Sequence, residues 1–169
     1  MEDAMAHPAQ SEAMAAAAPS ARGRTRYEDD LYTWVQEQVA LLRARRFDEV
    51  DVELVAEELE DLSKREYARL YSCLRVLVMH MLKWDQQAEH RTPSWIYSIR
   101  EQRRRFDRVL KGSPGLKSRL DEALAEAYPD ARDWATNETH LPPDEFPPDC
   151  PYAWDDLLQR PFDLDSVKT

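Results

Sequence analysis

The densest group of side chains able to perform acid–base or metal chemistry comprises Glu57, Glu58, Glu60 and Asp61. With His80 further along the chain, these acids suggest a carboxylate–histidine metal site inside a helical bundle. The Glu-x-x-His pair of di-metal bundles is missing from the sequence, because the residues three positions before the four histidines are Ala4, Leu77, Gln87 and Asn137. We therefore assign no metal ligand and no catalytic residue. A metal-dependent hydrolase using Glu57, Glu58 and His80 stays an alternative.

His80 is better explained as a structural residue. It lies in an almost continuous apolar segment from Cys73 to Trp84, and a helix that is apolar on most of its circumference is a buried one. A buried imidazole needs a hydrogen-bond partner. If the following helix packs antiparallel, His80 faces roughly residues 101–104. We therefore expect His80 to bond to Glu101 or Gln102, and these three residues to form a polar group in the core.

A second chemical feature is the basic helix predicted over residues 95–111. Its candidate interaction face consists of Arg100, Arg103, Arg104 and Arg108. Basic side chains near Trp95 could contact a phosphate backbone, so nucleic-acid binding through this helix is another alternative. We consider it the weaker one, because the chain has a net charge of −10, which repels nucleic acid at long range. Pairing of these arginines with acids of residues 27–62 and 114–133 is the expectation.

The charge is segregated along the chain. Residues 27–62 carry twelve acids and three bases, residues 63–113 carry five acids and twelve bases, and residues 114–169 carry thirteen acids and five bases. Such an acid–base–acid layout either neutralises itself when the parts pack together or presents a basic face beside acidic ones. We expect mainly internal neutralisation.

Helical periodicity predicts an all-α fold, an irregular bundle of about five to six helices. The capping box Thr25-Arg-Tyr-Glu28 predicts the start of a first helix that ends near Arg45, and a second begins near Asp51. The box Ser63-Lys-Arg-Glu66 predicts a break, with a kink in one long helix as the alternative. Further helices are expected from Thr92-Pro93 to Gly112, from about 114 to 128, and briefly around Trp134 after Pro129.

The C-terminal part is read as a Pro-rich strap, because five prolines fall between Pro142 and Pro151. Phe146, Cys150 and Tyr152 are its expected anchors on the core, and residues 152–159 could form a last helical turn or two. The domain organisation predicted is a disordered Ala-rich extension over residues 1–24, a single helical domain over 25–163 and a short tail over 164–169.

The expected cellular environment follows from what the sequence lacks. Two cysteines form no disulfide framework, no apolar stretch approaches eighteen residues, and the acidic start does not resemble a secretory signal. We therefore expect a cytoplasmic protein with reduced thiols, and no association with a membrane.

The sequence resembles a bacterial family catalogued as domain of unknown function 29. The resemblance covers about residues 26–163 and rests on several short stretches: Tyr27-Glu-Asp-Asp-Leu-Tyr-Thr-Trp34, Glu57-Glu-Leu-Glu60, His80-Met-Leu-Lys-Trp84, Ser94-Trp95, Ile99-Arg-Glu-Gln-Arg103, Tyr128, Ala131-Arg132 and Phe146-Pro-x-x-Cys-Pro-Tyr152. It implies a small all-helical protein of the bacterial cytoplasm and no particular activity. Our functional prediction is a non-enzymatic protein–protein interaction module without a cofactor. Its partner is an unknown protein, with a homodimer as one form of that contact.

Overall fold

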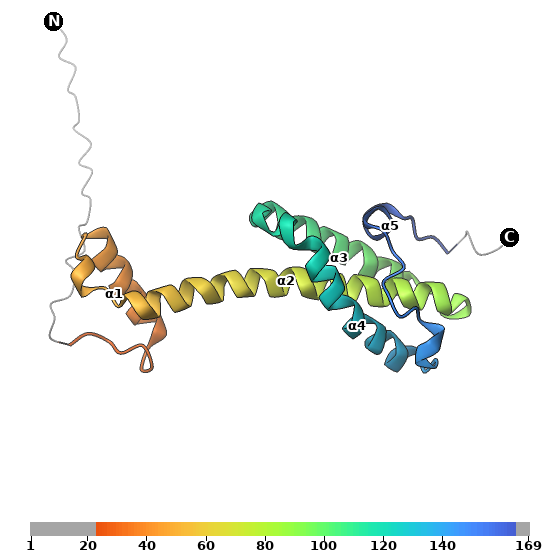
Figure 1. The fold of residues 1–169 in the computed structure, drawn as a ribbon, viewed down its shortest axis with the longest axis horizontal. Coiled ribbons are helices and arrows are strands. Elements are labelled where there is room, and N and C mark those ends of the chain that lie inside the picture. Colours follow the sequence, from red (N-terminus) through yellow and green to blue (C-terminus); the bar gives the residue numbers. More distant parts are fainter. Residues whose placement is uncertain (1–22, 165–169) are drawn as a thin grey trace, which may run out of the picture. The chain divides into compact units, whose positions relative to one another are not determined.

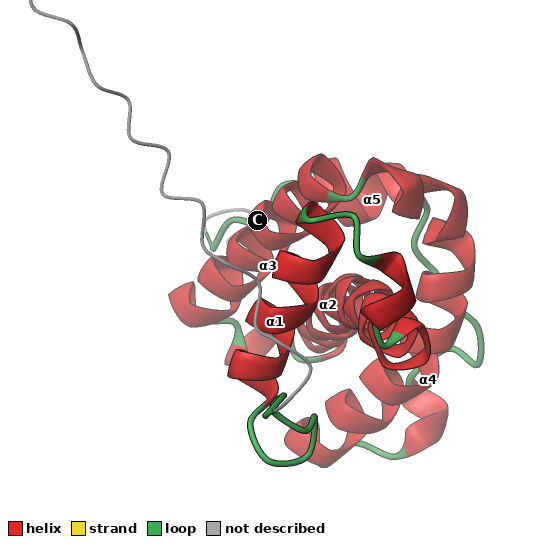
Figure 2. Ribbon diagram, turned by 90° about the vertical axis from the view of Figure 1, so that its left-hand side faces the viewer, coloured by secondary structure: helices red, strands yellow, loops and turns green. Residues whose placement is uncertain are grey.

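The computed structural model describes residues 23–164, which form helices and loops and contain no strand (Figures 1 and 2). The helices are α1 (Leu31–Arg43), α2 (Val52–Gln86), α3 (Pro93–Gly112), α4 (Leu120–Thr139) and α5 (Trp154–Gln159). This confirms the predicted all-helical class. The predicted disordered extension and tail lie outside the described residues, apart from Gly23, Arg24 and Leu164.

The helices divide into an N-terminal unit that ends at Leu59 and a C-terminal unit that begins at Glu60. In the N-terminal unit, Trp34 and Leu41 form the buried face of α1, and Tyr27 meets Trp34 edge to face at 5.2 Å between ring centroids. Buried Gln38 accepts a 2.9 Å hydrogen bond from the backbone N–H of Asp51, which fixes the start of α2.

The predicted start of the first helix is wrong. Asp30, not Thr25, caps α1, and its carboxylate accepts a hydrogen bond of 3.1 Å from the backbone N–H of Thr33. The Thr25 hydroxyl instead donates to the Glu37 carboxylate at 3.1 Å. Arg24, which we assigned to the extension, forms an ion pair with Glu49 in this unit. The contact of Thr25 with Glu37 therefore takes the place of the predicted capping box, and the short carboxylate of Asp30 caps the helix instead.

The predicted break at Ser63 is also wrong, because α2 runs without interruption from Val52 to Gln86. Ser63 is exposed within the helix. Most of its neighbours in the sequence are residues with a high helix propensity. The Lys64 ammonium also pairs with the Asp61 carboxylate, three residues earlier, at 2.8 Å. A Ser-x-x-Glu pattern acts as a capping box only at the start of a helix. Because α2 continues through Ser63 and Glu66, the pattern does not act as a cap here.

In the C-terminal unit, α3, α4 and α5 lie around the later part of α2, which is seen end-on in Figure 2. The contact face of α4 is a row of alanines four residues apart, all fully buried: Ala123, Ala127, Ala131 and Ala135. Small side chains at this spacing let two helices approach closely. Large side chains of α2, among them Leu74, Leu77 and Met81, fill the space on the other side.

The prediction of two helices separated at Pro129 is wrong as well. Residues Pro114–Arg119 form a 3-10 helix, and α4 then continues through Pro129 to Thr139. A proline inside a helix removes one backbone hydrogen bond. Buried Ala127, Tyr128 and Ala131 flank it on both sides, so packing holds the helix together across the missing bond.

The Pro-rich strap between α4 and α5 is held by side chains of the bundle. The Tyr128 hydroxyl donates to the carbonyl of Pro147 at 2.5 Å, and the Arg132 Nε donates to that of Phe146 at 3.2 Å. Phe146 and Tyr152 are buried and Cys150 is half-buried against the core, as predicted for the anchors. The Tyr152 hydroxyl donates to Asp85 on α2 at 2.8 Å.

Candidate functional site

α3 presents two different faces. It begins at Pro93, directly after Thr92, and its buried side consists of Ile99, Gln102 and Phe106. The predicted burial of Gln102 is therefore found. The opposite side carries four exposed arginines of the same helix: Arg100, Arg104, Arg105 and Arg108.

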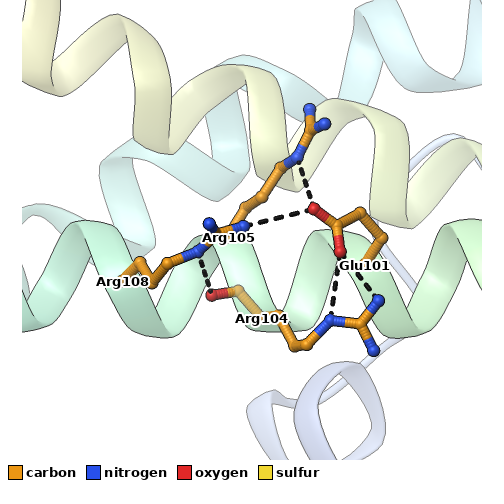
Figure 3. A network of polar contacts seen from close by, with 4 residues as sticks. All are labelled: Glu101, Arg104, Arg105 and Arg108. Atoms are coloured by element: carbon orange, nitrogen blue, oxygen red, sulfur yellow. Dashed lines mark hydrogen bonds and ion pairs between the residues drawn. The ribbon is translucent and has the colours of Figure 1, made fainter.

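Three of these arginines share one carboxylate, that of Glu101 (Figure 3). Arg104 reaches it at 2.7 Å, Arg105 at 3.0 Å and Arg108 at 3.2 Å. The hydrogen bonds from Arg104 and Arg105 hold the pKa of Glu101 below its usual range. Because three guanidinium groups meet one carboxylate, the cluster retains a surplus of positive charge.

This arrangement corrects two predictions. Arg104, Arg105 and Arg108 pair within α3, not with acids of residues 27–62 or 114–133. The i, i+3 and i, i+4 spacing to Glu101 makes the local pairs available before any distant acid is brought near. For the same reason Glu101 does not serve His80.

Arg103 does not belong to the exposed face, contrary to our prediction. Its guanidinium is half-buried and donates to the backbone carbonyls of Leu157 at 2.7 Å, Arg160 at 2.8 Å and Asp156 at 3.0 Å. These carbonyls close the C-terminal end of α5, where helix carbonyls lack partners within the helix. Burial, with the neighbouring charge of Arg160, lowers the pKa of Arg103. The role of Arg103 is therefore to fasten α5.

A groove with a volume of about 910 Å³ runs between α2 and α3. Its charged lining consists of one glutamate, Glu66, and four arginines: Arg65, Arg69, Arg105 and Arg108. Its apolar lining includes Cys73, Val76 and Val109. Burial raises the pKa of the Cys73 thiol, although Arg105 and Arg108 act in the opposite direction, so the thiol is protonated at neutral pH. Chemically, the groove is suited to binding an anionic group that also offers apolar surface.

His80 has a partner other than the one predicted. Its Nδ1 donates to the carbonyl of Val76, one turn earlier in α2, at 2.9 Å, and the ring is half-buried. The prediction failed because a histidine in a helix can bond to the carbonyl four residues before it, which requires no second helix. Burial lowers the pKa of His80, and the charge of Lys83 acts in the same direction.

Next to His80 lies a buried cation that the sequence analysis missed. Lys83 is 6 % exposed, and its ammonium pairs with the Glu138 carboxylate of α4. The same ammonium lies 4.5 Å from the centre of the Trp95 ring on α3. A lysine within an apolar run was the available signal, because a buried ammonium must find a carboxylate or an aromatic face.

The acids of the metal hypothesis have other partners. In the N-terminal unit, Glu58 accepts a 2.6 Å hydrogen bond from the Tyr27 hydroxyl, and Glu57 is exposed. His80 belongs to the C-terminal unit and bonds to Val76. Within residues 23–164, no group of three or more histidine, cysteine or acidic side chains is placed to hold a metal ion.

Several of the stretches that carry the family resemblance in the C-terminal unit contact the strap or the residues after it. Trp84 contacts Phe162 edge to face at 5.4 Å, Arg103 caps α5, and Tyr128 and Arg132 bond to the strap backbone. Phe146 and Tyr152 are the buried anchors of the strap itself. These parts of the sequence pattern therefore specify how the C-terminal segment is fastened to the bundle.

Comparisons with known proteins agree with the resemblance. None of the helices in the described part of the chain has the length and apolarity needed to cross a bilayer. Searches of curated proteins and of solved structures gave no match. The family model described as Domain of unknown function DUF29 matches residues 26–163. The chain therefore belongs to the DUF29 family.

Proposed function

We propose that this protein is a non-enzymatic interaction module that binds an acidic, partly apolar protein segment in the groove between α2 and α3. One observation carries the proposal: Arg65, Arg69, Arg105 and Arg108 line one groove together with Cys73, Val76 and Val109. An amphipathic helix with acids along its edges has the complementary chemistry.

The arginines of the groove are available to a partner even though each has a local contact. Arg69 pairs with Glu66 at 2.5 Å, and Arg105 and Arg108 share Glu101. The side chains of Arg69, Arg105 and Arg108 are 66 %, 56 % and 69 % exposed. Water screens such exposed pairs strongly, so an incoming carboxylate can join or replace them at little cost. Complementary charge then accelerates association and favours acidic partners.

The apolar part of the groove lining favours a protein segment over a nucleic acid. A phosphate backbone would use the arginines and leave Val76 and Val109 without a partner, whereas a peptide covers both kinds of surface. The cytoplasmic location that we propose is supported by the two free cysteines, Cys73 and Cys150.

The test is fluorescence anisotropy with a labelled helical peptide that carries glutamates along both edges of a leucine stripe. We expect saturable binding that weakens as salt is raised, because exposed charges are screened. The charge-reversed peptide, with lysines in place of glutamates, should not bind. Binding of both peptides alike, or of neither, would contradict the proposal.

A pair of double variants locates the site. Arg105→Glu/Arg108→Glu should reduce the affinity for the acidic peptide at least about tenfold, because two like charges then face the ligand. Arg100→Glu/Lys111→Glu makes the same change in net charge on the same helix at two exposed positions that do not line the groove. It should retain most of the affinity. A steeply salt-dependent shift of mixed DNA or RNA, lost only in the first variant, would favour nucleic acid instead.

A further inference from the structure

We propose that Gln102 is a specificity-determining residue of the groove, and that its amide pairs with one carboxamide side chain, of asparagine or glutamine, in the apolar stripe of the bound segment. This inference rests on the proposed binding role of the groove. It adds the chemical group that the partner carries and the residue of this chain that recognises it.

Gln102 is unusual among the buried polar side chains. Within residues 23–164 there are four such side chains, and three of them have a partner in the protein: Gln38, Lys83 and Thr139. The fourth, Gln102, is 8 % exposed, and its amide bonds to no group of the described chain. Burial of an unpaired amide is costly, because its N–H and C=O groups lose hydration without gaining a hydrogen bond.

The unpaired amide of Gln102 is accessible from the groove. Within the described residues, the fully enclosed side-chain nitrogens and oxygens without a partner are the Nε atoms of Arg24 and Arg75. The amide nitrogen and oxygen of Gln102 therefore each keep some accessible surface. Gln102 lines the groove between α2 and α3, so a ligand in the groove can reach both atoms.

Gln102 lies toward one end of the groove. α2 and α3 are joined by a short connection, and at the far end of α3 the Ser113 hydroxyl lies 3.5 Å from the Glu66 carboxylate of α2. Gln102 comes eleven residues before Ser113, and Val76 comes ten residues after Glu66. At 1.5 Å per residue, both are about 15 Å from that contact. The amide therefore belongs to the end of the groove that Val76 makes apolar.

The chemistry of the amide selects its partner. Gln102 offers N–H donors and a C=O acceptor in one plane. A carboxylate only accepts and leaves the Gln102 oxygen unpaired, while an ammonium group only donates and leaves the N–H groups unpaired. A leucine would cover the amide without replacing its hydrogen bonds to water. A second carboxamide supplies one donor and one acceptor in matching positions, so it satisfies both groups.

A helical partner can supply this carboxamide only from a side chain, because the peptide groups within a helix are already bonded to one another. The exposed arginines of the groove then remain for the acids along the edges of the segment. A polar pair at a single position also fixes the register of the segment, as a buried asparagine does in a coiled coil.

The first experiment measures whether the amide has a partner in the protein. Gln102→Met keeps the length of the side chain and removes both polar groups, so the melting temperature of the full chain should stay within about 1 °C or rise. Gln38→Met is the matched control, since Gln38 is 5 % exposed but accepts the N–H of Asp51. It should lower the melting temperature by roughly 3 °C or more. Equal losses in both variants would show a structural partner for Gln102 and overturn the inference.

The second experiment uses the acidic leucine-stripe peptide and a series in which one leucine at a time is replaced by glutamine. A glutamine ordinarily weakens an apolar contact, so most positions should lose affinity. At one position, the glutamine peptide should bind at least about threefold more tightly than the parent, because it pairs an amide that leucine leaves buried and unpaired.

The third experiment assigns this preference to Gln102. Gln102→Met should reverse it, with a change of at least about tenfold in the ratio of the two affinities. Gln86→Met makes the same chemical change at an exposed glutamine of α2 that does not line the groove, and it should retain the preference. Circular dichroism establishes that both variants are folded.

The outcomes separate this inference from the proposed function. If the acidic peptide binds but no stripe position responds to Gln102→Met, the carboxamide pair is wrong and the interaction role stands. If a glutamate at the responsive position binds more tightly than glutamine, the amide recognises a carboxylate and the inference is wrong. If no peptide of the series binds the unmodified chain at low salt, the proposed function itself fails.

Discussion

The Nε of Arg103 on α3 donates a hydrogen bond of 2.7 Å to the carbonyl oxygen of Leu157 on α5. The other two guanidinium nitrogens donate to the carbonyls of Asp156 and Arg160 at the same helix end. One side chain therefore serves three backbone acceptors at the end of a helix of six residues, where only the Asp156 carbonyl also accepts a backbone N–H, that of Arg160. The same guanidinium lies 5.3 Å from the centre of the Phe162 ring. These contacts tie α5 and the residues after it to α3.

Replacing Arg103 should therefore release α5. We expect Arg103→Lys to destabilise the protein by about 2–3 kcal/mol, because an ammonium cannot satisfy three carbonyls in the geometry of the guanidinium fork. Hydrogen exchange of the amides of residues 154–160 should accelerate. Arg100→Lys, at an exposed position of the same helix, is the control and should change stability by less than about 0.5 kcal/mol. Equal effects of the two substitutions would contradict the assigned role.

Tyr128 should make stability depend on alkaline pH. Burial raises its pKa to about 12, so the folded state holds the phenol proton more tightly than the unfolded chain, whose ordinary tyrosine pKa is 10.0. The resulting stability is fully present below pH 10 and is lost as the pH rises toward 12. Tyr128→Phe removes the hydrogen bond to Pro147 and should cost about 1–2 kcal/mol at neutral pH. Urea unfolding of both proteins should show this difference shrinking above pH 10, and a difference independent of pH would be inconsistent with a buried phenol.

His80 should titrate below the ordinary histidine pKa of 6.5. Burial of the ring is the main cause, and the Lys83 ammonium adds to it while Glu138 and the Val76 carbonyl oppose it. A depressed pKa contributes stability that is present above pH 6.5 and is lost as the pH falls through the folded-state value. The ring proton resonances of His80, assigned with His80→Gln, give the pKa directly in an NMR titration. A midpoint above 6.5 would contradict a ring whose pKa is lowered by burial.

A gain of stability is expected at the end of α4. His140 has a φ of 57°, in the left-handed region, where a side chain costs about 1–2 kcal/mol and glycine does not. His140→Gly should therefore raise the free energy of unfolding by about 0.5–1 kcal/mol. His90→Gly, at an exposed histidine outside the left-handed region, should lower it. Thermal unfolding measures both variants, and a loss of stability in His140→Gly would mean that the imidazole makes a compensating contact.

The sequence was most informative where a pattern is local. The apolar segment from Cys73 to Trp84 identified most of the buried part of α2, and Thr92-Pro93 marked the start of α3. The pattern was misleading at Ser63 and Pro129, where signals for helix ends are overruled by continuous packing or by strong helix formers. Sequence distance also cannot distinguish Arg103 from its neighbours. Only the position of α5 decides that Arg103 is a structural cap while Arg104, Arg105 and Arg108 remain on the surface.

The site itself could be foreseen only in part. The basic character of α3 is evident from composition, and the burial of Gln102 follows from helical spacing. The groove depends on α2 supplying Arg65 and Arg69 beside α3, which no local pattern reveals. Partners of single side chains, such as Val76 for His80, were missed because backbone carbonyls are acceptors at every position of the chain.

The enclosed position of Lys83 has a consequence for chemical labelling. Its ammonium is held between the Glu138 carboxylate and the Trp95 ring. An acylating reagent reacts only with the deprotonated amine, and it cannot reach this nitrogen while α2, α3 and α4 stay together. Lys64, Lys111 and Lys117 are exposed and should react at once. The delay before Lys83 is acylated therefore measures how often the bundle opens, and mass spectrometry of one peptide would read that opening rate in a lysate without purification.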